Sequence, residues 1–351
     1  MKFRNKQKWQ LIRQYMLGWS IALIFLSIVR GEGTEEIGSV KFDMGKSIII
    51  SMIGGIIFGA ISGYAQILTE EKGYKKISIQ RLLLLRIIYV LLFLFSIIGL
   101  AYLIFSKNLT FWEFAFEPGS FAIYLFIVAT DVFMFSLRQI NLFLGSNNLW
   151  NLFRGKFYTP REEKRIFMFL DLKSSTTHAE RLGHIRYSKL IQDCFNDLGV
   201  VAVNEADIYQ YVGDEVILSW KLEEGLRKQN CMAAYFNFKN QLLSKKEYYE
   251  QEYDCIPYFK AGLHSGIITV TEVGKYKKEI AYHGDTINTA ARIQGKCNEF
   301  GKELLISESL KNSLDTSDFS FEKLGSIELK GKERKVSLFA VSQTHILKEK
   351  A

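Results

Sequence analysis

The sequence predicts a chain in two parts, a bundle of four transmembrane helices followed by a soluble α/β domain. Four long apolar segments lie within the first 137 of the 351 residues. Lysine and arginine are concentrated at alternate ends of these segments, as they are beside membrane spans. After residue 164, strand-like and helix-like patterns alternate, which indicates an α/β or α+β domain whose helices cover a sheet.

The composition argues against several other classes. A net charge of +8 could indicate a nucleic-acid partner, but the N-terminal basic residues lie beside apolar runs and form no single long patch. We therefore expect a lipid bilayer as the partner and no nucleic acid. The cysteines are widely spaced without a CxxC pair, which predicts reduced thiols and neither a disulfide framework nor a zinc ribbon. They are Cys194, Cys231, Cys255 and Cys297.

The apolar segments are mostly near the length of about 20 residues that crosses a bilayer as a helix. They span residues 15–29, 47–68, 87–105 and 120–137. The first is the shortest and follows a basic stretch, so a signal peptide is its alternative interpretation. The stretch "LSIVRGEG" that ends it offers no small-residue cleavage site, which favours a retained helix.

Charges at the ends of the spans predict their orientation. Residues 1–13 and the loop 69–86 carry five Lys or Arg each, whereas the loop 30–46 has three among four acids and the loop 106–119 has one. Basic loops stay in the cytoplasm, so we expect a multi-pass protein of the cell membrane with both termini and the soluble domain cytoplasmic. The predicted division is a cytoplasmic tail at 1–13, a transmembrane domain at 14–137, a connector at 138–164, a soluble domain at 165–342 and a tail at 343–351.

Two features of the spans point to helix packing and to a polar contact. Gly55, Gly59 and Gly63 form a ridge of small residues that either joins two protomers or packs the bundle. Asp131 is an ionisable residue within the fourth span. Such a group usually faces a partner or a cavity, and the alternative is a position close enough to the cytoplasmic surface to be wetted.

The soluble domain reads as alternating elements. Strands are predicted at 165–172, at 200–206, in the hairpin 209–220, at 258–274 and 279–284, at 303–308, and in a terminal pair at 325–331 and 335–341. Helices are predicted at about 175–198, 223–253 and 285–300.

Two aspartates stand where these elements end. Asp171 leaves the apolar strand "IFMFLDL" just before a hydroxyl-rich helix start, and the alternative is a simple helix cap. Asp214 stands at the tip of the hairpin "YQYVGDEVILSW" after Gly213, and the alternative is an ordinary turn acid. If strand and hairpin are neighbours, the two carboxylates meet and can bind two hard divalent cations, as in nucleotidyl transfer.

A third element carries polar groups suited to a nucleotide. In "HGDTINTAARIQ", Asn288 and Arg292 are four residues apart and share one helix face. An arginine can stabilise phosphate charge and an asparagine can orient a ribose hydroxyl. A solvated helix face is the alternative.

Five motifs, in this order, resemble the catalytic domain of class III nucleotidyl cyclases, the adenylate and guanylate cyclase family. They are "FLDLKSSTT", "YVGDEVILSW", "AGLHSG", "YHGDTINTAARI" and "IELKGKERKVSLFAV". The resemblance covers about residues 165–341 and implies a ferredoxin-like α/β domain that works as a homodimer, with active sites at the interface.

The resemblance also implies roles for single residues. One protomer would supply Asp171 and Asp214 for two Mg²⁺ or Mn²⁺ ions, and the other would supply Asn288 and Arg292. The ribose 3′-hydroxyl would attack the α-phosphate of a nucleoside triphosphate, releasing pyrophosphate and a 3′,5′-cyclic nucleotide. The residues implied for the triphosphate are Thr176 and Lys330.

The base-reading positions depart from both patterns of the family. Gln210 and Ala281 replace the Lys with Asp or Thr typical of adenylate cyclases and the Glu with Cys typical of guanylate cyclases. Nothing acidic is present to meet the N–H donors of guanine, so the sequence favours ATP. We expect a membrane-anchored adenylate cyclase in intracellular signalling. The alternatives are a guanylate or other nucleotide cyclase, a non-catalytic cyclase-like signalling module, and a four-helix transporter or channel with a regulatory domain.

Overall fold

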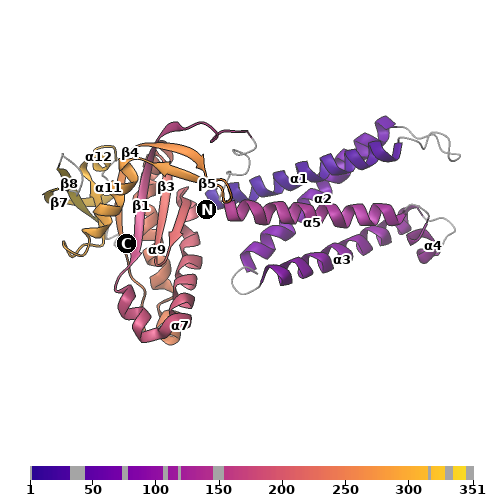
Figure 1. Ribbon diagram of the computed structural model, residues 1–351. Coiled ribbons are helices and arrows are strands. Elements are labelled where there is room, and N and C mark those ends of the chain that lie inside the picture. The colour runs from indigo at the N-terminus through magenta and orange to yellow at the C-terminus, as the bar shows by residue number, and fades with distance from the viewer. Residues whose placement is uncertain are drawn as a thin grey trace, which may run out of the picture. The chain divides into compact units, whose positions relative to one another are not determined.

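The computed structural model divides the chain into two compact units. One comprises Lys2–Phe143 and the other begins at Leu144 (Figure 1). The structure describes residues 2–31, 44–72, 78–105, 110–117, 120–144, 154–314, 318–328 and 335–344. Residues 145–153 of the predicted connector and 345–351 of the predicted tail lie outside these ranges, and the predicted domain boundaries stay predictions.

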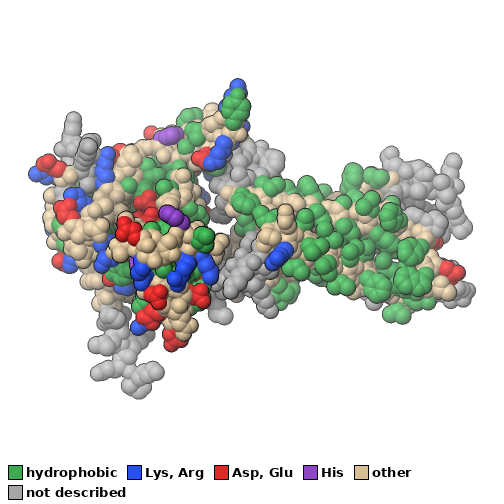
Figure 2. Space-filling view, turned by 60° about the horizontal axis from the view of Figure 1, so that its bottom comes forward, with side chains coloured by type: hydrophobic (Ala, Val, Ile, Leu, Met, Phe, Trp, Pro, Cys, Tyr) green, Lys and Arg blue, Asp and Glu red, His purple; other side chains and the backbone are tan. Residues whose placement is uncertain are grey.

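The first unit contains four helices that are long and apolar enough to cross a membrane. The candidate spans are Gln7–Val29, Gly45–Glu70, Ile79–Gly99 and Ser120–Phe143, so all four predicted segments are confirmed as helices. Figure 2 shows hydrophobic side chains over most of the visible face of this unit, while charged side chains gather on the other unit. The helices of the unit are α1 (Lys2–Gly31), α2 (Met44–Lys72), α3 (Ile79–Phe105), the short α4 (Phe111–Ala115) and α5 (Ser120–Leu144).

The glycine ridge of α2 packs against α1 of the same chain. A Cβ atom built on Gly55 would lie 2.3 Å from the Cα atom of Ser20, and one built on Gly59 would lie 2.3 Å from the Cα atom of Met16. Real Cβ atoms do not approach backbone this closely, so only glycine allows the two helices to come together here. Of the two interpretations of the ridge, the structure therefore supports packing within the bundle.

A buried ion pair crosses the middle of the bundle. Asp131 on α5 is 1% exposed and accepts hydrogen bonds from Nε and Nη2 of Arg86 on α3, at 2.5 and 2.8 Å. Ser62 on α2 donates to Asp131 at 2.6 Å and accepts from Arg86 at 2.5 Å. Asp131 thus faces a partner and is not wetted. Arg86, which we counted at the end of a span, lies inside α3.

Removing one member of this pair should cost more than removing both. The Asp131→Leu change alone leaves an uncompensated buried charge on Arg86, and we expect it to lower the free energy of unfolding by about 3–5 kcal/mol. Adding Arg86→Leu removes that charge, so the double variant should melt above the single variant. Thermal unfolding of the full chain in detergent measures both, and a double variant that melts no higher than Asp131→Leu would contradict this account.

The second unit is built on an eight-stranded sheet. Its strand order is β2-β3-β1-β4-β6-β8-β7, with β5 paired to β4, and only β4 and β6 run parallel among the pairs described. The strands are β1 (Arg161–Leu172), β2 (Asp207–Val212), β3 (Glu215–Lys221), β4 (Phe259–Val273), β5 (Glu279–His283), β6 (Leu304–Ser307), β7 (Phe319–Ile327) and β8 (Val336–Gln343). The helices are α7 (Ser175–Asp197), α8 (Leu222–Leu226), α9 (Asn230–Ser244), α10 (Lys246–Tyr253), α11 (Asp285–Gly295) and α12 (Glu308–Lys311), with 3₁₀ turns at Leu198–Asn204 and Arg227–Gln229.

Some predicted elements of this unit were wrong in detail. The strand predicted at 325–331 begins earlier, at Phe319, and ends at Ile327. The strand predicted at 200–206 is mainly a 3₁₀ turn, because Leu198 and Val201 insert into the core beneath α9. The single helix predicted at 223–253 is three helices, α8, α9 and α10. It breaks between α8 and α9, where Lys228 and Gln229 take positive φ angles of 50° and 55°, and again between α9 and α10 at Lys245, whose φ of −112° is not helical.

Alternate residues of β1 face two different layers. Ile166, Met168 and Leu170 point into the large core shared with α7 and α9. Phe167 and Phe169 point to the opposite face, where Ala290 of α11 packs. Because side chains alternate along a strand, Asp171 falls on the α11 face of the sheet.

Candidate active site

The structure brings Asp171 and Asp214 to one edge of the sheet. β1 pairs antiparallel with β3, and Asp171 lies directly across from Glu215. Asp214 precedes Glu215 in the turn between β2 and β3, where Gly213 has a φ angle of 60° that glycine adopts without strain. The strand and the hairpin are thus neighbours, as predicted, and both aspartates are half-buried.

The electrostatics of this edge favour a bound cation. Burial, followed by the negative charge of Asp214, raises the pKa of the Asp171 carboxyl, although Lys260 and a 3.2 Å hydrogen bond from Gln294 Nε2 act in the opposite direction. Burial and the same two aspartates raise the pKa of Glu215 to about 7. A divalent cation bound here would offset the negative charge that raises the pKa values of Asp171 and Glu215.

These groups fit a hard metal ion only as part of a larger set of ligands. Carboxylate oxygens are the donors that Mg²⁺ and Mn²⁺ accept. In the part of the chain that the structure describes, no three His, Cys, Asp or Glu side chains are arranged to hold a metal by themselves. The chain's own carboxylates would therefore need further oxygen ligands, such as those of phosphates.

Lys260 is a residue of this site that the sequence analysis missed. It lies on β4 directly across from Asp171, is 8% exposed, and donates a hydrogen bond to Oδ1 of Asn298. A buried cation next to two half-buried aspartates is suited to hold phosphate oxygens. A lysine at the start of the strand-like stretch "KAGLHSG" was the signal in the sequence.

Two glycines of that stretch hold α11 against the sheet. A Cβ atom on Gly262 would lie 2.2 Å from the backbone nitrogen of Gln294, and one on Gly266 would lie 2.4 Å from Oγ1 of Thr286. The helix therefore rests directly on β4, which places Gln294 within hydrogen-bonding distance of Asp171. This close packing explains why glycine stands at both positions of the motif "AGLHSG".

Asn288 and Arg292 lie on α11 away from its buried face. The buried positions of α11 are Thr286, Thr289, Ala290 and Ile293. Asn288 is exposed and Arg292 is half-buried, one helical turn apart as predicted. Both side chains are thus available to a group outside the core of their own chain.

The predicted substrate residues come from different elements of the domain. Thr176 is exposed in the first turn of α7. Gln210 is exposed on β2, next to a bulge that follows Ile208, and Ala281 is half-buried on β5. Lys330 lies outside the described residues.

In a class III nucleotidyl cyclase domain, the sheet brings an aspartate at the end of one strand next to an aspartate at the tip of a neighbouring hairpin, and a helix on the sheet presents Asn and Arg. Asp171 on β1, Asp214 in the β2–β3 turn and the helix α11 have this arrangement. Residues 157–347 match the family of the adenylate and guanylate cyclase catalytic domain, and the chain belongs to this family.

Relatives and solved structures agree with this fold. The chain is 30% identical over 213 residues to "Adenylate cyclase 2" of Rhizobium meliloti (strain 1021), covering 60% of this chain and 58% of that protein. It is 25% identical over 188 residues to "Adenylate cyclase" of Anabaena cylindrica, covering 51% and 36%. The matched part of the chain thus spans 58% of the length of the first relative and 36% of the length of the second. The structure of a bacterial light-regulated adenylyl cyclase superimposes with a TM-score of 0.56 at 17% identity, over 66% of this chain and 68% of that one.

Proposed function

We propose that the protein is a membrane-anchored adenylate cyclase that converts ATP to 3′,5′-cyclic AMP and pyrophosphate in intracellular signal transduction. The observation that carries the proposal is the pairing of β1 with the hairpin tip, which joins Asp171 and Asp214 in one electrostatic cluster. Family membership and two relatives named adenylate cyclases support it.

In this proposal Asp171 and Asp214 hold two Mg²⁺ or Mn²⁺ ions. The ions, when bound, lower the pKa of the ribose 3′-hydroxyl and neutralise the charge of the phosphates. Lys260 meets the same phosphates from β4, and Thr176 and Lys330 are the further residues proposed for the triphosphate. Gln294 and Lys260 keep the Asp171 carboxyl oriented between them.

A homodimer is part of the proposal because α11 presents its functional groups on two different sides. Asn288 and Arg292 lie on the face of α11 that does not pack against the sheet, while Gln294 of the same helix contacts Asp171. A partner subunit would supply its Asn and Arg to orient the ribose and stabilise the charge that develops on the α-phosphate. Each dimer would contain two such sites.

We also propose that the four helices anchor the enzyme in the cell membrane, with both termini and the catalytic domain in the cytoplasm. Support comes from the four candidate spans and from the basic loops of the sequence. The supply of ATP on that side of the membrane is consistent with the orientation.

Incubation of the purified full chain in detergent with each of the four nucleoside triphosphates and Mn²⁺ tests the function. Mass spectrometry of the products should show cyclic AMP and pyrophosphate as the main products, formed from ATP. Faster formation of cyclic GMP would establish the guanylate cyclase alternative. Absence of any cyclic product, from protein that is folded and dimeric, would establish the non-catalytic module.

The base contacts can be tested by two substitutions. A carboxylate at position 210 can accept from the guanine N–H groups and meets only an acceptor at adenine N1, so Gln210→Glu should shift preference toward GTP. An unpaired buried polar group costs roughly 1–3 kcal/mol, so the ratio of kcat/KM for ATP and GTP should move by about one to two decades.

Ala281→Asp should move the same ratio in the opposite direction, because it gives the adenine amino group an acceptor. The measurement is kcat/KM for both nucleotides in the unaltered chain and in each variant. Ratios that stay unchanged in both variants would show that Gln210 and Ala281 do not read the base.

A further inference from the structure

The two proposed base-reading residues stand on strands that are far apart in the sheet. Gln210 is on β2 and Ala281 is on β5, and the strands β3, β1 and β4 separate them in hydrogen-bonding order. The neighbours of these two residues nevertheless meet. The rings of Tyr209 and Tyr282 are 4.6 Å apart at 40°, and the backbone nitrogen of Tyr282 is 3.4 Å from the hydroxyl of Tyr209. β5 therefore folds over the face of the sheet and reaches β2.

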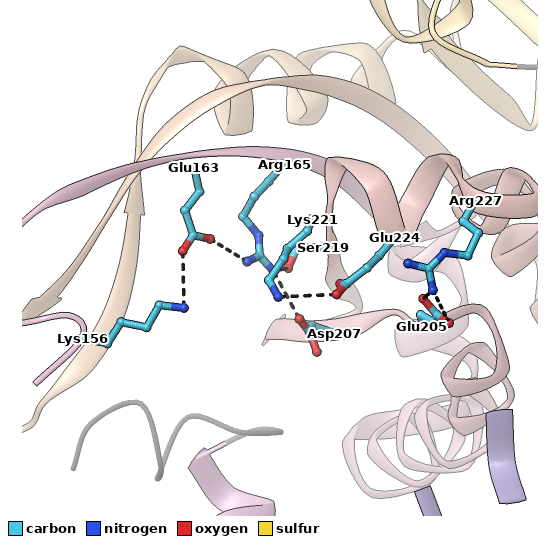
Figure 3. A network of polar contacts seen from close by, with 9 residues as sticks. All are labelled: Lys156, Glu163, Arg165, Glu205, Asp207, Ser219, Lys221, Glu224 and Arg227. Carbon is cyan, nitrogen blue, oxygen red and sulfur yellow. Dashed lines mark hydrogen bonds and ion pairs between the residues drawn. The ribbon is translucent and has the colours of Figure 1, made fainter. Parts of the chain in front are cut away.

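A buried arginine of the central strand β1 contacts both sides of this junction. Arg165 is 5% exposed, and its guanidinium carbon lies 4.9 Å from the ring centre of Tyr282 on β5. Its Nη2 donates to Oδ2 of Asp207 on β2 at 3.2 Å and to Oγ of Ser219 on β3 at 3.0 Å. Its Nη1 donates to Oε2 of Glu163 at 3.0 Å (Figure 3).

The surroundings of Arg165 keep its charge and fix its plane. Burial acts to lower the pKa of Arg165, but Tyr282, Asp207 and Glu163 together raise it above its usual value. A planar guanidinium can stack on an aromatic ring and bond in its own plane at the same time, which an ammonium group cannot do. The three strands that it contacts are thereby held in one arrangement.

We propose that Arg165 is a positioning residue that sets the spacing between Gln210 and Ala281, and through it the selectivity for the base of the nucleotide. The inference rests on the proposed function, because it assigns a role within the same site. Ala281 has no polar side-chain atom, so recognition depends on where the β5 backbone and the Gln210 amide lie relative to each other. Arg165 governs that distance without touching the nucleotide.

The test compares Arg165→Lys with the matched variant Arg227→Lys in the full chain. Lysine retains the positive charge at position 165 but loses the stacked fork, so the strands can shift. A displacement of the order of 1 Å should change the ATP-to-GTP ratio of kcat/KM by about tenfold or more. Arg227 pairs with Glu205 at 3.2 Å elsewhere in the same view (Figure 3) and is largely exposed, so its variant should keep the ratio of the unaltered chain.

A second variant, Tyr282→Leu, keeps the inference testable if Arg165→Lys does not fold. It removes the stacking surface without removing a charge, and the same direction of change in selectivity is expected. Melting temperatures show which variants are folded. A folded variant at either position whose ratio stays within about threefold of the unaltered chain would overturn the inference.

The two proposals fail in different ways. If the unaltered chain forms no cyclic nucleotide, the proposed function fails and the inference with it. If the unaltered chain is active and a folded variant at Arg165 or Tyr282 leaves the ratio within about threefold of the unaltered chain, only the positioning role of Arg165 fails.

Discussion

Replacing Asp171 or Asp214 by alanine should abolish cyclic nucleotide formation. Each change removes a carboxylate that would hold the ions acting on the attacking hydroxyl and on the phosphates. The expected loss in kcat is about 10³-fold or more, which corresponds to several kcal/mol of the barrier. Residual activity within about tenfold of the unaltered chain would rule out the metal assignment.

The folded state should survive these changes. The raised pKa of Asp171 means that its negative charge costs stability in the folded protein, so removing the charge should not lower the melting temperature without metal. Mn²⁺ should raise the melting temperature of the unaltered chain and not that of either variant. Glu250→Ala is a matched control, because Glu250 is a partly exposed carboxylate paired with Lys246 on α10.

Two inactive chains should recover activity when they are combined. The Asp171→Ala chain lacks a metal ligand, and the Arg292→Ala chain lacks the group proposed to act in the partner's site. In a heterodimer of the two, one site keeps every residue and the other lacks both. An equal mixture that assorts at random should regain about a quarter of the activity of the unaltered dimer, since half of the dimers carry one complete site.

The activity of the isolated heterodimer shows whether Asp171 and Arg292 of one site come from different chains. Two tags of different kinds allow the heterodimer to be isolated, so that its formation is measured independently of activity. An isolated heterodimer with no activity would show that Asp171 and Arg292 serve the same site from the same chain. The combination of Asp171→Ala with Asp214→Ala is the matched control. Each site of that heterodimer lacks one of the two aspartates, so these two chains should not complement each other.

Local patterns predicted most of the fold. The four apolar helices and the strands β1, β3, β4, β5 and β8 contain apolar or β-branched residues in patterns that are visible in the sequence. The 3₁₀ turn at Leu198–Asn204 was missed because its valines have strand propensity, and contacts with α9 override it. The breaks at Lys228 and Gln229 were missed because no glycine or proline marks those positive φ angles.

Two residues of the site, Lys260 and Gln294, were missed because they come from elements that are distant from Asp171 in the sequence. The ends of strand and hairpin predicted the positions of Asp171 and Asp214, since both ends are encoded locally. Lys260 and Gln294 come from other elements, and their approach to Asp171 depends on the register of β4 and on the packing of α11. Likewise, Asp131 predicted a polar partner, but the sequence did not identify Arg86, which is 45 residues away in the chain.

The contacts of Arg86 restrict how the helical unit can move. Its bonds to α2 and α5 are 2.5–2.8 Å long, and a hydrogen bond is lost when donor and acceptor separate by little more than 3.2 Å. Sliding one helix by a single residue displaces it by about 1.5 Å along its axis and would break this cluster. Gly55 and Gly59 lock α1 to α2 in the same way. A stimulus received by these helices would therefore reach the end of α5 as a tilt or rotation of the whole bundle and not as the piston stroke of one helix.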